Sequence, residues 1–330
     1  MSAGIAVAHP HGGGGGAKID VHAHYLPADY RQALIDHGQS HPDGFPVLPT
    51  WSPEAHLAMM DQVGIRTAML SVSSPGVTFG LDPVAWARSV NETGAATVRQ
   101  HPGRFGLFAT LPLPDVDAAL AELTYAFDTL NADGVVVLTN FEEIYLGDPR
   151  FDAVFSELNR RKGVMFIHPT SPACFEDTSL GYPRPILEFL LDTTRAVANM
   201  VLNGTLTKYP DIRVIVPHSG SALPVVADRI AGFAGLLPLG GHQPEEIDVI
   251  GTLQRLYYEV GAGFPFPRQI SALLDLVDAG RLLYGTDFPF GGLPGIQANA
   301  DALLNTKLLR RRELEGVLRG NAVGLFPRLG

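Results

Sequence analysis

The segment KIDVHAH (residues 18–24) is a short run with apolar residues that closes with His22, Ala23 and His24. Such a run predicts a buried β-strand. Seven further runs of the same kind follow, separated by segments with helical periodicity. The others are TAMLSV (67–72), FGLFATL (105–111), DGVVVL (133–138), GVMFIH (163–168), IRVIVPH (212–218), LYYEV (256–260) and LLYGTD (282–287). Their apolar residues are continuous rather than alternating, which is typical of parallel strands that are covered on both faces.

Helix starts are predicted between these strands, where a capping residue precedes a proline at the first helical position. The clearest pairs are Ser52-Pro53, Asp82-Pro83 and Asp148-Pro149. Strands that alternate with helices over about 300 residues predict a single α/β domain, a (β/α)8 TIM barrel over residues 18–330. Residues 1–17 are predicted to be a flexible glycine-rich tail. A doubly wound open sheet is the alternative, although no glycine-rich phosphate-binding turn follows the first strand.

Composition excludes several classes of protein. Apolar residues make up 46% of the chain and charged residues 18%, so the chain can bury a large core and is not disordered as a whole. The net charge of −10 argues against nucleic-acid binding. No apolar run approaches the roughly 20 residues that cross a bilayer, and the first residues do not form a signal peptide. The single cysteine, Cys174, excludes an internal disulfide, and we expect a cytoplasmic protein.

Metal-binding side chains stand at the predicted strand ends, where barrels of this type carry their reactive groups. They are His22, His24, His168, His218 and Asp287. Residues two apart on a strand point the same way, so His22 and His24 both aim into the barrel mouth. Imidazoles and a carboxylate are ligands that zinc prefers. One buried histidine is usually a packing residue, so the prediction of a metal site depends on the five occurring together.

The remaining histidines are given no role in this site. His9 and His11 have the same spacing as His22 and His24, but they lie beside a glycine tract. The others are expected to be surface or packing residues: His37, His41, His56, His101 and His242.

Several motifs resemble those of the amidohydrolase superfamily, in its aminocarboxymuconate-semialdehyde decarboxylase-like branch. They are KIDVHAHYLP (18–27), WSPEAHLAMMDQVGI (51–65), FIHP (166–169), VPHSG (216–220) and YGTDFPF (284–290). The resemblance runs from about Lys18 to Phe326. Within this branch, further stretches are similar to 6-methylsalicylate decarboxylases: HPDGFPVLPTWSPE (41–54), SSPG (73–76), LPLPDVD (111–117) and FIHPTSP (166–172).

The resemblance implies a site with one divalent metal ion, which is expected to be zinc, with manganese as the alternative. The implied ligands are His22, His24, His168 and Asp287, and His218 would be an acid or base. A second metal held by a carboxylated lysine is excluded, because no lysine occurs between Lys18 and Lys162. The branch's arginine that binds a second substrate carboxylate is missing from GFPVLPT (44–50), which favours a monocarboxylate.

The implied reaction is nonoxidative decarboxylation of an ortho-hydroxybenzoate, 6-methylsalicylate to m-cresol and CO2, with Asp287 or His218 as proton donor. Candidate substrate contacts are Tyr25, Phe264, Phe266, Phe288, Phe290, Arg184 and Arg195. The two arginines could instead pair with Glu188 or Asp192. Glu259 could orient a ligand histidine. The loops GFPVLPT (44–50) and GFPFP (263–267) could cover the mouth or form a subunit contact, and a homodimer is expected.

Three other functions remain open at this point. The same metal could activate water against a lactone or an amide, or the chain could decarboxylate an aminocarboxymuconate-semialdehyde-type substrate. A non-catalytic, metal-dependent binding protein is the third possibility. Analysis of the products separates the two reactions, because decarboxylation releases CO2 whereas hydrolysis of a lactone opens a ring.

Overall fold

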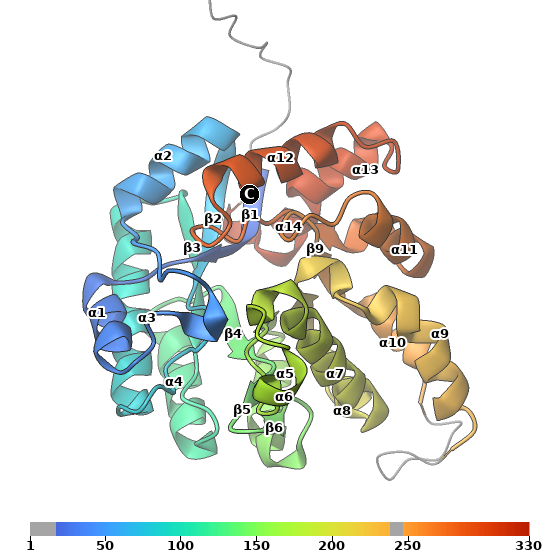
Figure 1. The fold of residues 1–330 in the computed structure, drawn as a ribbon, viewed down its shortest axis with the longest axis horizontal. Helices are drawn as coiled ribbons and strands as arrows, with labels where there is room; N and C mark the ends of the chain where they lie inside the picture. The colour runs from blue at the N-terminus through green and yellow to red at the C-terminus, as the bar shows by residue number, and fades with distance from the viewer. Residues whose placement is uncertain (1–17, 238–246, 330) are drawn as a thin grey trace, which may run out of the picture.

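The computed structural model describes residues 18–237 and 247–329, and eight parallel strands form a barrel at its centre (Figure 1). Their order around the barrel follows the sequence, β1-β2-β3-β4-β7-β8-β9-β10. The strands are β1 (Lys18–His24), β2 (Ile65–Ser71), β3 (Phe105–Thr110), β4 (Gly134–Leu138), β7 (Val164–His168), β8 (Arg213–Val216), β9 (Tyr257–Glu259) and β10 (Leu282–Leu283). The predicted (β/α)8 architecture is confirmed. The predicted tail and His242 lie outside the described residues.

The barrel closes where β1 meets the segment after β10. The backbone N–H of Val21 donates to the Tyr284 carbonyl (2.9 Å), and that of His24 donates to the Phe288 carbonyl (2.7 Å). Ala23 and Phe288 form a parallel bridge. We call residues 21–24 and 284–288 the seam. This closure excludes the open doubly wound sheet.

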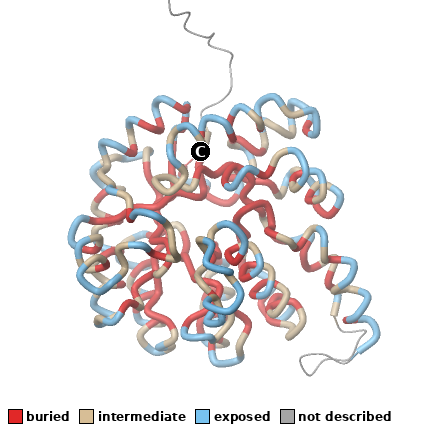
Figure 2. Tube along the Cα trace, viewed as in Figure 1, coloured by how far each residue is buried: buried red, intermediate tan, exposed pale blue. Residues whose placement is uncertain are grey.

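Helices surround the strands, and Figure 2 shows the buried strands at the centre and the exposed faces of the helices outside. The helices are α1 (Ala28–Asp36), α2 (Pro53–Val63), α3 (Pro83–Gln100), α4 (Val116–Asp128), α5 (Asp152–Arg161), α6 (Phe175–Thr178), α7 (Glu188–Leu202), α8 (Thr205–Lys208), α9 (Leu223–Ala234), α10 (Val249–Arg255), α11 (Arg268–Leu276), α12 (Leu293–Leu304), α13 (Arg311–Glu315) and α14 (Asn321–Leu325). A two-stranded hairpin, β5 (Asn140–Phe141) and β6 (Ile144–Tyr145), lies outside the barrel sheet.

The predicted capping pairs start helices as expected. Ser52 accepts a hydrogen bond from the backbone N–H of Ala55 at the start of α2, and Asp82 caps α3. Asp148 instead caps a 3-10 turn, and α5 begins after it. A capping oxygen satisfies a backbone N–H that has no partner within the helix, which explains why these residues precede helices.

Aromatic rings fill the barrel interior below the mouth. Phe108 of β3 stacks on Phe166 of β7 at 5.6 Å, although β4 lies between these strands, so the two rings meet inside the barrel. Phe326 packs against Phe108 at 5.7 Å. The His22 ring lies 5.0 Å from Phe166, so Phe166 forms the floor beneath the histidines. This interior is a packed core rather than a pore.

Two predicted strands are too long. β8 ends at Val216 and β10 at Leu283, so His218 and Asp287 follow their strands rather than belonging to them. Both have positive φ angles, 52° and 60°, which an extended strand does not allow. The two side chains are therefore placed by turns beyond the strand ends.

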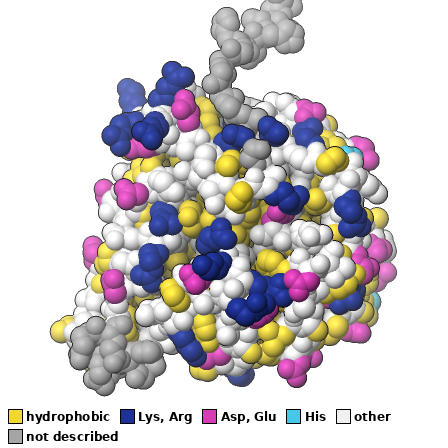
Figure 3. Space-filling view, turned by 180° about the vertical axis from the view of Figure 1, so that it is seen from behind, with side chains coloured by type: hydrophobic (Ala, Val, Ile, Leu, Met, Phe, Trp, Pro, Cys, Tyr) yellow, Lys and Arg dark blue, Asp and Glu magenta, His cyan; other side chains and the backbone are white. Residues whose placement is uncertain are grey.

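The surface carries charges of both signs. On the face opposite that of Figure 1, lysine and arginine side chains lie next to acidic and hydrophobic ones (Figure 3). Within residues 18–237 and 247–329, no helix combines the length and the apolar character that crossing a membrane requires.

Candidate metal centre and active site

Four of the predicted ligands come together at the mouth of the barrel. The ligand atoms of His22, His24, His168 and Asp287 all lie within 4.8 Å of one another. Asp287 Oδ1 is 3.1 Å from His24 Nε2 and 3.5 Å from His22 Nε2. Three imidazoles and one carboxylate thus surround a single point, and they come from β1, β7 and the segment after β10.

Glu259 at the end of β9 orients His22. The Nδ1–H of His22 donates to Glu259 Oε2 (2.9 Å), and Glu259 also accepts from the backbone N–H groups of His218 (3.1 Å) and Ala262 (2.8 Å). Burial alone would raise the pKa of Glu259, but the hydrogen bond and charge of His22 outweigh it, so this pKa lies below its usual value. With Nδ1 carrying the proton, Nε2 of His22 presents a lone pair.

Gly285 makes the contact between Glu259 and His22 possible. A Cβ atom at residue 285 would lie 2.4 Å from Cγ of Glu259 and 2.7 Å from Cβ of His22. Distances this short are not tolerated between carbon atoms, so only glycine fits at this position.

The other two histidines have fixed tautomers as well. His24 Nδ1–H donates to Ser71 Oγ (2.9 Å), because that hydroxyl donates its own hydrogen to the Ala23 carbonyl (3.0 Å). His168 Nδ1–H donates to the Pro169 carbonyl (2.7 Å). Burial lowers the pKa of His24 and holds the pKa of His168 well below its ordinary value. Both rings are therefore neutral and suited to be ligands.

The described residues leave the Nε2 atoms of His22 and His24 buried without a hydrogen-bond partner. Leaving a buried polar atom unpaired costs about 1–3 kcal/mol, which a bound cation would offset. Burial lowers the pKa of His22, but Asp287 and Glu259 outweigh it and raise this pKa, so a proton and a cation compete for the same atom. Three nitrogen donors and one carboxylate fit a divalent metal with an open coordination position.

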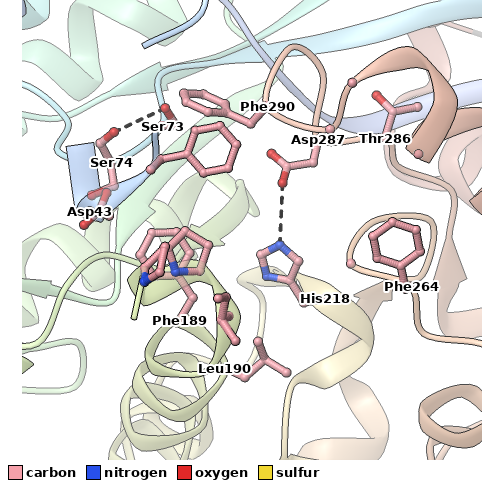
Figure 4. A pocket seen from close by; sticks show the side chains of 18 of the residues that line it. Asp43, Ser73, Ser74, Phe189, Leu190, His218, Phe264, Thr286, Asp287 and Phe290 are labelled. Atoms are coloured by element: carbon pink, nitrogen blue, oxygen red, sulfur yellow. Dashed lines mark hydrogen bonds and ion pairs between the residues drawn. The ribbon is translucent and has the colours of Figure 1, made fainter. Parts of the chain in front are cut away.

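Asp287 also faces His218. Asp287 Oδ2 lies 4.0 Å from His218 Nε2, as the dashed line in Figure 4 shows. Burial would raise the pKa of Asp287, but the charge of His22 and the neighbouring imidazoles of His218 and His24 hold it well below its usual range. His218 begins a 3-10 turn, η4 (His218–Gly220), and its carbonyl accepts from Gln269 Nε2 (2.5 Å). The positive φ angle of His218 is a strained conformation, and strained backbone of this kind clusters at functional sites.

A cavity of about 600 Å³ opens beside these groups. Its aromatic and aliphatic wall includes Phe45, Ile186, Phe189, Leu190, Phe264, Phe290 and Ile296. Its polar lining includes Asp43, Ser73, Ser74, His168, His218, Gln269, Asp287 and Asn299. Figure 4 shows Asp287 and His218 facing each other between Phe290, Phe189 and Phe264. No lysine or arginine is among the described residues that line it.

The structure brings two of the predicted aromatic contacts to the cavity, Phe264 and Phe290, while Phe266 does not line it. Tyr25 is fully buried and donates its hydroxyl to the Val90 carbonyl (2.8 Å), away from the lining. Phe288 packs on His56 with ring centroids 4.6 Å apart. Tyr25 points away from the cavity because it directly follows His24, and side chains alternate in an extended segment.

Neither predicted arginine lines the cavity. Arg195 pairs with Asp192 on the same helix (2.9 Å), and this pairing is one of the two alternatives that the sequence left open. Arg184 donates from Nε to Ser171 Oγ (3.0 Å) and lies over the Phe175 ring.

Phe189 and Asn299 were missed as lining residues. They lie on α7 and α12, and neither carries a motif that would have marked it. Phe45 was signalled only through its loop, since GFPVLPT (44–50) and GFPFP (263–267) were expected either to cover the mouth or to form a subunit contact. Phe45 and Phe264 line the cavity.

A (β/α)8 barrel with three histidines and an aspartate at its mouth defines the class of metal-dependent barrel enzymes. The Amidohydrolase family model matches residues 19–328. The chain therefore belongs to the amidohydrolase family, and the predicted resemblance is confirmed.

Known proteins place the chain among the decarboxylases of this family. It is 36% identical to the 6-methylsalicylic acid decarboxylase of Penicillium expansum, over 95% of this chain and 97% of the relative. A crystal structure of an amidohydrolase II is 35% identical with a TM-score of 0.88 and covers 94% of this chain and 99% of that one. The dihydroxybenzoic acid decarboxylase of Polaromonas sp. JS666 was solved with manganese and 2-nitroresorcinol. Its structure matches with a TM-score of 0.79 over 94% of this chain and 97% of that chain. At 22% identity, this match shows the shared fold alone. The prediction of a carboxy-lyase is confirmed.

Proposed function

We propose that the protein catalyses the metal-dependent nonoxidative decarboxylation of an ortho-hydroxybenzoate, with 6-methylsalicylate giving m-cresol and CO2. One observation carries this proposal. The cavity joins the His22/His24/His168/Asp287 cluster to an aromatic wall, and its described lining offers no lysine or arginine to a carboxylate. A carboxylate that enters this cavity therefore has to be bound at the cluster, which orients the ring beside Asp287 and His218. The activity of the Penicillium expansum relative agrees with this substrate.

The four clustered residues would hold one divalent ion, zinc or manganese. Manganese is bound in the Polaromonas structure, and imidazole ligands also suit zinc. When bound, the ion supplies positive charge that a carboxylate and the neighbouring phenolic oxygen can share.

The reacting proton is assigned to the pair formed by Asp287 Oδ2 and His218 Nε2. From this pair a proton reaches the ring carbon that bears the carboxylate, and the ring loses its aromaticity. The bond to the carboxyl group then breaks, its electron pair restores the aromatic ring, and CO2 departs. Phe189 and Phe290 hold the ring and exclude water. Gln269 holds the His218 carbonyl and so keeps His218 opposite Asp287.

The lining also bears on the competing substrates. An aminocarboxymuconate-semialdehyde-type substrate carries a second carboxylate, for which the described lining provides no cation. We therefore favour a monocarboxylate.

The test is a panel of hydroxybenzoates with protein that has been loaded with manganese or with zinc. We expect 6-methylsalicylate to give m-cresol and CO2 in equal amounts, measured by chromatography and gas analysis. Replacing His218 by Asn should lower kcat by about 10²–10⁴-fold while the metal content stays unchanged. Opening of a lactone or cleavage of an amide without CO2 release would establish the hydrolytic alternative instead.

We also propose that the protein forms a homodimer. Large apolar side chains are exposed in one short stretch beside the cavity: Leu180, Tyr182, Ile186 and Leu187. Ile186 itself lines the cavity. Clustered exposed apolar residues mark interaction surfaces. Light scattering after size-exclusion chromatography should give twice the chain mass, and the double variant Ile186→Ser/Leu187→Ser should give the monomer mass.

A further inference from the structure

One side of the cavity is built without side chains. Gly263, Gly291, Gly292 and Gly295 line it, and we call these four residues the glycine wall. They come from the loop between β9 and α11, the loop between β10 and α12, and the start of α12. A Cβ atom at Gly263 would lie 3.4 Å from Cδ2 of His218, so the wall begins directly beside the reacting groups.

Asn299 continues this wall along α12. Gly292, Gly295, Ile296 and Asn299 follow the spacing i, i+3, i+4, i+7, which puts them on one face of the helix. Asn299 is only 7% exposed and lines the cavity, and no described residue forms a hydrogen bond with its side chain. Because the side chain lines the cavity and has no hydrogen bond to the described protein, the carboxamide of Asn299 is available to a polar group of whatever fills the cavity.

We propose that the site, besides 6-methylsalicylate, takes ortho-hydroxybenzoates whose ring carries a chain longer than a methyl group, and that it binds them more tightly when the chain ends in a hydroxyl or carbonyl that Asn299 binds. This inference rests on the proposed decarboxylation and names its substrate class more closely. The glycine wall gives room for the chain, and a carboxamide can donate to a carbonyl and accept from a hydroxyl. A volume of about 600 Å³ lies within the range of cavities that bind ligands well above the size of a single substituted ring.

The experiment uses phenols, the products of the reaction, because they bind without reacting. Metal-loaded enzyme is titrated with 3-methylphenol, 3-propylphenol and 3-(2-hydroxyethyl)phenol, and inhibition of 6-methylsalicylate decarboxylation is measured in parallel. The last two compounds have the same number of heavy atoms and differ only in the terminal group. Their ratio of dissociation constants therefore reports the hydrogen bond and not the length of the chain.

In the Asn299→Leu variant, which keeps the number of side-chain heavy atoms and their branching, the preference for the hydroxyethyl over the propyl compound should fall by about three- to tenfold. Gln297→Ala is the matched control, because Gln297 lies on the same helix and faces solvent. This control should keep the wild-type ratio. An unchanged ratio in Asn299→Leu would overturn the role of Asn299.

The Gly295→Val variant tests the glycine wall. A Cβ atom there would meet Phe264 at 3.6 Å, an ordinary contact, and Gly295 lies in a helix, so the substitution fits the backbone. The substitution should weaken the binding of 3-propylphenol and of 3-(2-hydroxyethyl)phenol about tenfold relative to that of 3-methylphenol. An equal effect on all three phenols would contradict the assignment of the wall to the chain.

These outcomes separate the two proposals. If 6-methylsalicylate is decarboxylated but neither variant alters the ratios, only the substrate class proposed here fails. If no hydroxybenzoate releases CO2 and no phenol binds, the proposed decarboxylation itself fails.

Discussion

Nε2 of His22 faces the cluster and has no hydrogen-bond partner in the part of the chain that the structure describes, while Nδ1, on the opposite side of the ring, is held by Glu259. The same division of labour recurs at His24, where Ser71 holds Nδ1. Each imidazole is thus oriented by a residue that does not itself contact the cluster's centre. The cluster thus has two kinds of residue, those whose free ring nitrogens face its centre and those that hold these rings in place, and we expect the two kinds to respond differently to mutation.

Removing a ligand should remove metal and activity together. In the His22→Ala variant one of three imidazole donors is lost, so we expect metal content measured by elemental analysis to fall far below one ion per chain, with loss of CO2 release. His37→Ala, at an exposed position, is the control and should keep both. Activity that persists in metal-free His22→Ala would refute the mechanism.

Removing a support should weaken the site without abolishing it. Glu259→Gln replaces the anion that fixes the tautomer of His22, and loss of such a partner typically costs 10- to 100-fold in metal affinity or activity. Glu122→Gln is the matched control, because Glu122 is also buried and accepts from Arg88 and Asn91 away from the cluster. Competition with a coloured chelator measures the affinity. Equal losses in the two variants would show a general structural effect.

At the scale of elements, α2 carries a histidine that the site does not use. His56 is fully buried, accepts a hydrogen bond at Nδ1 from Trp51 Nε1 (3.0 Å), and is packed between Phe105 and Phe288. Burial lowers the pKa of His56 to about 3. The unfolded chain therefore binds a proton between pH 6.5 and 3 that the folded protein does not, and stability falls as the pH drops through this window.

The acid sensitivity of the protein should decrease when this histidine is removed. Between pH 7.5 and 5, His56 accounts for about 2 kcal/mol of lost stability. His56→Gln keeps an acceptor for Trp51 but does not titrate, so urea unfolding should show a smaller loss than in wild type. His37→Gln changes an exposed histidine and should behave like wild type. Equal losses in His56→Gln and wild type would contradict the role of His56.

The strands of the barrel could be predicted because buried parallel strands leave a local trace, a short apolar run between cap and stop signals. The cluster of His22, His24, His168 and Asp287 could be predicted because each residue stands at the end of such a run or just beyond it. The points at which β8 and β10 end could not be predicted, because His218 and Asp287 adopt positive φ angles that only their tertiary surroundings make acceptable. A sequence pattern carries no information on such a conformation.

The substrate contacts could be predicted only in part. Phe264 and Phe290 line the cavity, whereas Tyr25 and Phe288, equally close to ligands along the chain, pack elsewhere. Phe189 and Asn299 reach the cavity from α7 and α12, and how closely a helix approaches the mouth depends on packing over the whole barrel. Glu259 was predicted as a support for a ligand, and the structure places it against His22.

For the whole molecule, we expect the His22/His24/His168/Asp287 cluster to stabilise the fold when it holds a metal ion. A ligand that binds only the folded state stabilises it by about 2.7 kcal/mol at a free concentration of 100 times its Kd. Chelation should therefore lower the Tm by several degrees, and added manganese or zinc should restore it. The His22→Ala protein should show no such response. Scanning calorimetry checks this, and a Tm that is indifferent to chelation in wild type would contradict a resident ion.

The seam places this centre at the junction of the chain's first and last strands. His22 and His24 stand on one side of it and Asp287 on the other, and backbone hydrogen bonds between the two sides close the barrel. During synthesis on the ribosome, the nascent polypeptide has the three imidazole donors long before the carboxylate has been added. The four residues of the cluster cannot come together until translation has passed Asp287, so an ion that needs all four would be incorporated late in the maturation of the enzyme.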